Sequence, residues 1–288
     1  MKISEIFKER LSFSFEVFPP KNDQPMEPLL KTLSELYRFE PDFISCTYGA
    51  GGTTKGRSKE VCESVKKSGH EIITHFTCIG NTCSDIKTII NEYTHIGVEN
   101  ILAMRGDFPK GQQGTGGDFD HADKLITFLK AEFPHVCLAA AGYPEKHILA
   151  SSFESDMVHL RSKQDAGAEF IMLQLCHDVD AYARFAERAR KAGVTVPFVV
   201  GLMPILVKDP VIRMTIAKGC SIPQELAAIM GKYGDDSESF KKAGIEYTVE
   251  QLYRYINAGA NGIHIFTLNK YEDVSKIVLA SGIKVQKQ

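Results

Sequence analysis

The feature that most constrains the fold of this sequence is an alternation of short apolar segments with longer segments of helical period, repeated along almost the whole chain. Apolar segments predicted to be strands lie at 13–18, 43–48, 72–78, 100–105, 136–142, 169–175, 197–203 and 262–268. Patterns typical of helices lie at 28–38, 57–68, 84–96, 121–132, 155–166, 179–192 and 248–258. A glycine, the residue that best tolerates a left-handed helix end, follows five of them, namely Gly69, Gly97, Gly167, Gly193 and Gly259.

Eight strands that alternate with helices, without a linker or a shift in composition, predict an α/β fold. We expect a single (β/α)8 TIM barrel that forms one domain over residues 1–288. A doubly wound open sheet is the competing prediction, because its buried strands are equally apolar. The irregular segment 208–240 is expected to hold two or three short helices, and the glycine-rich segment 111–117 to be a mobile loop.

Composition excludes several classes of protein. With 43% hydrophobic residues, 24% charged residues and a net charge of −2, the chain has no basic block for nucleic acid or a membrane surface. No apolar run approaches the ~18 residues of a membrane-spanning helix, and the first ten residues mix both charge signs, unlike a signal peptide. The seven cysteines include no C-x-x-C pair, so we expect neither a metal site nor a disulfide framework, and a cytoplasmic location.

Polar residues stand where the predicted strands end. Glu16 lies within an apolar strand, where a carboxylate is unfavourable unless it is paired, protonated or in use, although the solvated face of an edge strand is the ordinary alternative. Other strands end at Thr47, His75, Arg105, Asp107, Tyr143, Gln174 and Thr267. In a barrel, the carboxyl ends of the strands meet on one face, which is where barrel enzymes hold their sites. We therefore predict an active site at that face.

These residues also carry a resemblance to a known family. Phe15-Glu16-Val17-Phe18-Pro19-Pro20, Thr47-Tyr48-Gly49-Ala50, His75-Phe76-Thr77-Cys78, Arg105-Gly106-Asp107, Tyr143-Pro144-Glu145, Asp165-Ala166-Gly167-Ala168 and Thr267-Leu268-Asn269 stand in the order and spacing of the 5,10-methylenetetrahydrofolate reductase family. The match runs from Ser12 to Lys270. The resemblance implies a flavoprotein barrel that moves a hydride from NADH or NADPH through FAD to methylenetetrahydrofolate.

The resemblance also implies roles for single residues. Glu16 would be the general acid that opens the imidazolidine ring of the folate, which needs a carboxyl kept protonated by its apolar strand. Asp107 would act beside the flavin and the pterin, and Gln174, Thr267 and Lys270 would bind the substrate. FAD would be bound by Thr47, His75, Arg105, Gly106, Asp107, Tyr143, His147, Asp156 and Lys163. No G-x-G-x-x-G fingerprint is present, so we expect the barrel loops to hold FAD. The resemblance also implies that nicotinamide and folate use the same flavin face in turn, which predicts ping-pong kinetics.

Three alternatives stay open at this point. The segment after the seventh strand departs from the family near Pro210 and Met214, so electrons could arrive through a partner protein in place of a nicotinamide. A flavin-free lyase or isomerase would use Glu16 and Asp107 as an acid–base pair, but this chain has no good phosphate-binding glycine loop for such an enzyme. A non-catalytic folate-binding subunit would have no need of a buried carboxylate. The sequence leaves open whether the donor is NADH or NADPH, and whether the chain forms a homo-oligomer.

Overall fold

The barrel predicted from the sequence is confirmed. The computed structural model describes residues 1–48, 55–107 and 116–283. Eight parallel strands close into a barrel in sequence order, namely β1 (Ser12–Val17), β2 (Phe43–Cys46), β3 (Ile72–Thr77), β4 (Asn100–Met104), β5 (Cys137–Gly142), β6 (Phe170–Leu173), β7 (Phe198–Leu202) and β8 (Gly262–Phe266). An open sheet is excluded because β8 pairs with β1, with Ser14 opposite His264.

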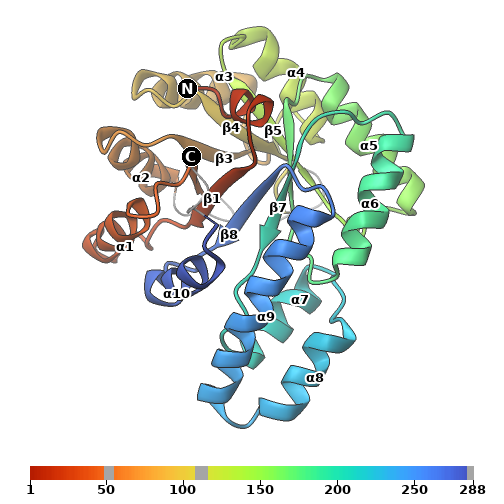
Figure 1. Ribbon diagram of the computed structural model, residues 1–288. Coiled ribbons are helices and arrows are strands. Elements are labelled where there is room, and N and C mark those ends of the chain that lie inside the picture. Colours follow the sequence, from red (N-terminus) through yellow and green to blue (C-terminus); the bar gives the residue numbers. More distant parts are fainter. Residues whose placement is uncertain (49–54, 108–115, 284–288) are drawn as a thin grey trace.

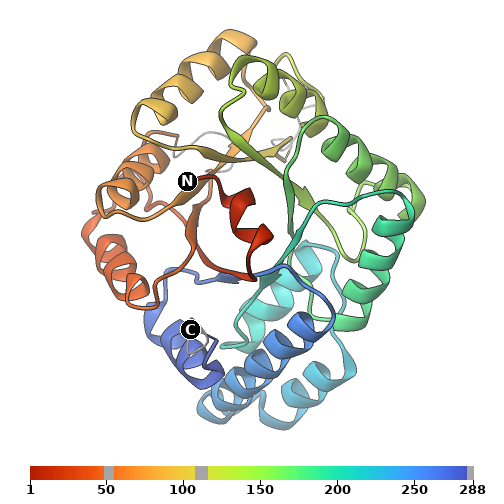
Figure 2. The same ribbon diagram turned by 45° about the horizontal axis from the view of Figure 1, so that its top comes forward.

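Helices surround the barrel on all sides (Figure 2). They are α1 (Glu27–Tyr37), α2 (Lys55–Lys67), α3 (Cys83–His95), α4 (Ala122–Glu132), α5 (Phe153–Asp165), α6 (Val179–Lys191), α7 (Lys208–Ala217), α8 (Gln224–Tyr233), α9 (Ser237–Asn257) and α10 (Tyr271–Ser281). Except for α9, the predicted strands and helices begin and end within two residues of these bounds. The glycine ends are confirmed as well, since all five glycines have positive φ.

Three helices differ from the sequence prediction. The helix predicted at 248–258 begins at Ser237, because the side chain of Asp236 caps it by accepting from the backbone N–H groups of Glu238 and Ser239. The 3₁₀ helix η1 (Ile3–Lys8) and α10 were not predicted. The short helices expected in 208–240 are present as α7 and α8, together with the first turn of α9. The expected loop at 111–117 and the glycines at 49–52 fall largely outside the described residues.

The N-terminal end of the barrel is closed by η1. Ile3 and Ile6 pack against the side chains that fill the barrel interior, which include Phe43, Leu102 and Phe170. The backbone N–H of Ile3 donates to Oδ1 of Asn100 at 2.8 Å. In Figure 2, η1 lies across the centre of the ring of helices. With this end filled, only the opposite end can hold an open site.

Helices α7, α8 and α9 lie together and project from one side of the barrel (Figure 1). They share an apolar cluster of their own, in which Leu226 and Phe240 pack near Met203, just after β7. The hydroxyl of Tyr247 on α9 donates to the carbonyl of His177, just after β6. On α7, Oγ1 of Thr215 lies 3.1 Å from Nε2 of His177, so α7 lies beside the carboxyl end of β6. Among the described residues, no helix has the length and apolar character needed to span a bilayer.

Candidate active site

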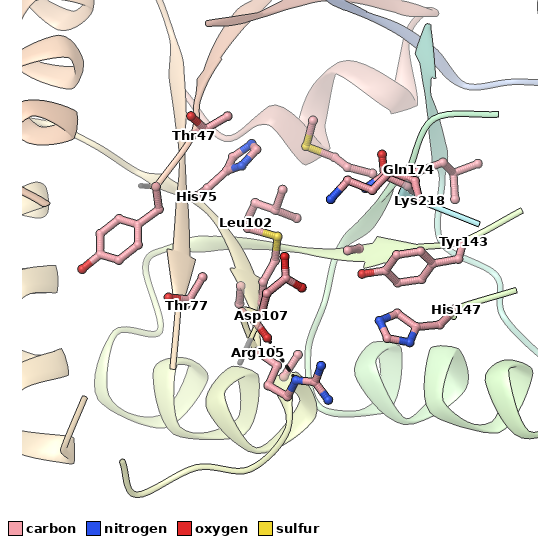
Figure 3. Close-up of a pocket in the computed structure, with 18 of the residues that line it drawn as sticks. Thr47, His75, Thr77, Leu102, Arg105, Asp107, Tyr143, His147, Gln174 and Lys218 are labelled. Atoms are coloured by element: carbon pink, nitrogen blue, oxygen red, sulfur yellow. Dashed lines mark hydrogen bonds between the residues drawn. The ribbon is translucent and has the colours of Figure 1, made fainter. Parts of the chain in front are cut away.

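A cavity of about 560 Å³ opens at the carboxyl ends of the strands (Figure 3). Its volume lies in the range of ordinary small-molecule sites. It is lined by nearly all of the residues predicted from the sequence, namely Glu16, Thr47, His75, Arg105, Gly106, Asp107, Tyr143, His147, Asp156, Lys163 and Gln174. Of the seven strand ends predicted to bring polar residues to this face, six contribute these side chains to the cavity, and Thr267 of the eighth strand does not line it.

Glu16 lies between the imidazoles of His75 on β3 and His264 on β8. Its Oε2 lies 3.7 Å from Nε2 of His75 and 3.9 Å from Nε2 of His264. His264 is held by two serine hydroxyls, Ser14 Oγ at 2.8 Å from Nδ1 and Ser45 Oγ at 3.0 Å from Nε2. These side chains come from β1, β2, β3 and β8, so the carboxylate of Glu16 lies next to both histidines only because the barrel is closed.

The charges around Glu16 differ from the expected apolar setting. Burial raises the pKa of its carboxyl, but His264, His75 and Lys218 lower it, and the net result is a pKa below the ordinary value. Burial lowers the pKa of His75 itself to about 4, so this imidazole is neutral at pH 7. At that pH the lowered pKa of Glu16 therefore depends on His264 and Lys218. The protonated Glu16 that the family role needs stays a prediction, because the lowered pKa describes the chain without a ligand.

The turn after β4 depends on Gly106. Its φ of +93° is left-handed, and an added Cβ would lie 3.0 Å from Cγ2 of Ile79 and 3.1 Å from Cβ of Thr77. This turn brings Arg105 and Asp107 to the cavity on either side of the glycine (Figure 3). The Arg105 Nε–H donates to the carbonyl of Gly106 at 3.1 Å.

The β5–α5 segment forms a second wall that carries two charged side chains, Asp156 and Lys163. Asp156, 6% exposed, accepts from the backbone N–H of His147 at 3.0 Å. Lys163 donates to the carbonyl of Ala141 at 2.9 Å, and burial lowers its pKa although Asp156 and Asp123 act to raise it. The His147 ring stands edge-on to Tyr143, with centroids 4.5 Å apart. Burial raises the pKa of Tyr143 to about 12, so its hydroxyl is neutral.

Two predicted substrate residues are placed away from the cavity wall. Thr267 is 1% exposed and its hydroxyl donates to the carbonyl of Glu16 at 2.6 Å, which fixes the end of β1. Lys270 is an exposed residue that precedes α10 as its N-cap. Gln174 does line the cavity, and its Oε1 accepts from the N–H of Leu175 at 2.8 Å, which leaves the amide N–H groups to a ligand. The substrate roles of Thr267 and Lys270 stay predictions.

Some lining residues were not among the predicted site residues, and they are of two kinds. Leu102, Met104 and Met172 form an apolar floor, and their alternate positions in β4 and β6 could have indicated this. His121, Asp123, His159, Met214 and Lys218 come from helices or helix ends, where no sequence pattern distinguishes a lining side chain from a solvated one. Within the described ranges, no group of three or more His, Cys, Asp or Glu side chains is placed to hold a metal ion.

Comparisons with known proteins show the family to which the chain belongs. A sequence profile of the family "Methylenetetrahydrofolate reductase" matches residues 2–282. The 5,10-methylenetetrahydrofolate reductase of Escherichia coli is 30% identical over 276 residues, which cover 96% of this chain and 92% of that protein. Methylenetetrahydrofolate reductase 1 of Schizosaccharomyces pombe is 31% identical over 98% of this chain. The chain spans about half the length of the yeast and plant relatives, 49% for the S. pombe protein.

Solved structures share the fold at low sequence identity. An uncharacterised Clostridium thermocellum protein, described as binding two copies of 5-methyl-5,6,7,8-tetrahydrofolic acid, is 14% identical and superposes with a TM-score of 0.66 over 99% of both chains. A dihydropteroate synthase of Xanthomonas albilineans, 11% identical, superposes with a TM-score of 0.52 over 96% of this chain and 94% of its own. The profile match over nearly the whole chain, with the E. coli relative, shows that this chain belongs to the methylenetetrahydrofolate reductase family.

Proposed function

We propose that this chain reduces 5,10-methylenetetrahydrofolate to 5-methyltetrahydrofolate, with electrons from NADH or NADPH that pass through FAD. The observation that carries the proposal is the position of Glu16, a carboxylate between two imidazoles at one end of a cavity whose other end carries cations. An acid is needed where the folate ring opens, and cations are needed where a dinucleotide binds. The relatives named methylenetetrahydrofolate reductase support the reaction, and plant relatives named as NADH enzymes support NADH as the donor.

The cavity offers polar groups and an apolar surface that suit FAD. The Nε2 of His75 is buried and has no hydrogen-bond partner among the described residues, so it is available to a polar atom of the cofactor. Arg105 and Lys163 bring positive charge suited to a pyrophosphate, and Leu102 and Met104 provide an apolar surface for a ring system. FAD, when bound, would supply the capacity to accept a hydride from a nicotinamide and donate it to the folate.

The residues of the chain would bind and orient the substrate. Gln174 presents amide N–H groups, because its carbonyl oxygen is already held by Leu175, and a pterin edge offers acceptors to match them. Asp107 lies at the end of β4 in the same cavity, where its charge would act on both ring systems. Thr267 holds the backbone of Glu16, so it would act on the position of the acid.

Glu16 would gain its proton as the ligands bind. In the ligand-free chain its pKa is lowered, so it is a carboxylate at neutral pH. Ring systems stacked in the cavity would remove water from the carboxylate, and desolvation raises the pKa of an acid. The acid would therefore be protonated in the complex where ring opening needs it.

The test is a visible absorption spectrum of the purified protein with FAD, recorded anaerobically before and after addition of NADH and then of methylenetetrahydrofolate. The proposal predicts a flavin band that NADH bleaches and the folate restores. A band that only NADPH bleaches, or only a redox partner protein, would change the donor. Absence of any flavin band after incubation with FAD would refute the reductase and favour a flavin-free lyase or a folate-binding subunit.

A further inference from the structure

The cavity contains two sets of cationic side chains on opposite sides. Arg105 and Lys163 lie on the β4 and β5 side, where both donate hydrogen bonds to backbone carbonyls. Lys218 lies on the other side, and Figure 3 shows it close to Gln174. The first set belongs to the half of the cavity assigned above to FAD. Lys218 belongs to the half that contains Gln174 and Glu16.

The ammonium of Lys218 is available to a ligand. Lys218 is the exposed C-cap residue of α7, and among the residues that the structure describes its side chain makes no hydrogen bond or ion pair. Its charge reaches Glu16, since it contributes to the lowered pKa of that carboxyl. No ion pair joins Lys218 to Glu16 within the part of the chain that the structure describes, so the ammonium can bind another anion.

The position of Lys218 is fixed by the end of α7. Met214, one turn earlier on the same helix, also lines the cavity, so α7 presents one face to it. The chain then turns at Gly219, with φ +69°, and the Sγ of Cys220 donates to the carbonyl of Leu175 at 2.9 Å. Leu175 follows Gln174, so this contact ties the end of α7 to the residue expected to bind the pterin.

An unpaired cation beside a pterin site is suited to the anionic end of a folate. A folate bears its carboxylates on a glutamyl tail, and with the pterin held by Gln174 that tail has to leave through the mouth of the cavity. Lys218 is exposed and lines the cavity, and its flexible four-carbon side chain can follow the tail. Lys270, the cation expected from the sequence, is not among the lining residues.

We propose that Lys218 binds a carboxylate of the glutamyl tail, and so makes the site select folates over pterins that lack the tail. This inference rests on the proposed function and deepens it by naming a residue for the tail. The same ammonium would also suit the pyrophosphate of a nicotinamide dinucleotide, which is a second source of negative charge. The experiment below separates the two.

The first measurement is equilibrium binding of 5-methyltetrahydrofolate to the FAD-loaded protein, compared with the 5-methyl-tetrahydropteroate that lacks the glutamate. Lys218→Met should weaken binding of the folate by about tenfold, the effect of losing one charge-assisted hydrogen bond, and should leave the affinity for the truncated compound as it was. The matched control is Lys191→Met, because Lys191 ends α6, forms an ion pair with Glu187 and is absent from the cavity lining. Lys270→Met, measured beside them, tests the cation expected from the sequence.

Other results would overturn the inference. Equal folate binding in Lys218→Met and Lys191→Met would refute it, as would an equal loss for the truncated compound. A higher KM for NADH in the flavin half-reaction, with folate affinity retained, would assign Lys218 to the dinucleotide. A wild-type protein that binds no folate at all would refute the proposed function instead, so the two failures are distinguishable.

Discussion

The carboxylate of Glu16 lies 3.7 Å from Nε2 of His75, and that nitrogen has no hydrogen-bond partner among the described residues. Burial lowers the pKa of His75 to about 4, so at neutral pH the pair consists of a carboxylate and a neutral imidazole. A buried polar nitrogen without a partner is unfavourable in the free chain and becomes favourable when a ligand atom satisfies it. This pair links the predicted flavin half of the cavity to the predicted acid.

His75→Ala should weaken FAD binding, because it removes the nitrogen available to the cofactor. The expected loss is about 1–3 kcal/mol, or roughly fivefold to 150-fold in Kd, measured by titration of the apoprotein with FAD. His95→Ala is the control, since His95 is exposed in the last turn of α3. Equal FAD affinity in the two variants would show that His75 does not contact the cofactor.

Gly106→Ala should destabilise the turn that presents Arg105 and Asp107. The left-handed φ and the contacts at 3.0 and 3.1 Å predict a loss of about 1–3 kcal/mol in the free energy of unfolding, with weaker FAD binding. Gly231→Ala is the matched control, because Gly231 lies within α8 and an added Cβ meets nothing within 4 Å. That change should be neutral or stabilise the helix by up to about 1 kcal/mol. Urea unfolding of both variants measures the difference, and similar losses would contradict the account of the turn.

Stability should fall as pH decreases from about 6.5 to about 4. Burial lowers the pKa of both His75 and His177 to about 4, whereas the unfolded chain binds these protons near pH 6.5. The unfolded state therefore binds more protons within this window, so the contribution of each histidine is complete above pH 6.5 and is lost toward pH 4. The effect is on the order of 3 kcal/mol at most for each residue.

His177→Gln tests this pH dependence away from the cavity. His177 Nε2 lies 3.1 Å from Oγ1 of Thr215, a contact that an amide can retain. The free energy of unfolding, measured by urea at several pH values, should vary less steeply in the variant between pH 6.5 and 4. The same slope in both proteins would contradict the assigned cause.

The sequence was sufficient to predict the barrel and most of the site, because period and glycine ends locate the strands and the strands carry the polar residues. It did not predict η1, since six residues of 3₁₀ helix carry too little periodicity to stand out, although Ile3 and Ile6 close the barrel. It also missed Lys218, which lies about two hundred residues from Glu16 and reaches the cavity only through the packing of α7. It did not indicate that two histidines from other strands flank Glu16, because only closure of the barrel brings them together.

The central claim is that Glu16 is the acid for the folate and has no part in flavin reduction. It is tested most directly by the two half-reactions of FAD-loaded Glu16→Gln in an anaerobic stopped-flow instrument, with Glu92→Gln, an exposed change on α3, as control. We predict bleaching of the flavin by NADH at close to the wild-type rate, and restoration of the band by methylenetetrahydrofolate slowed by roughly a hundredfold or more. Restoration at the wild-type rate would contradict the account.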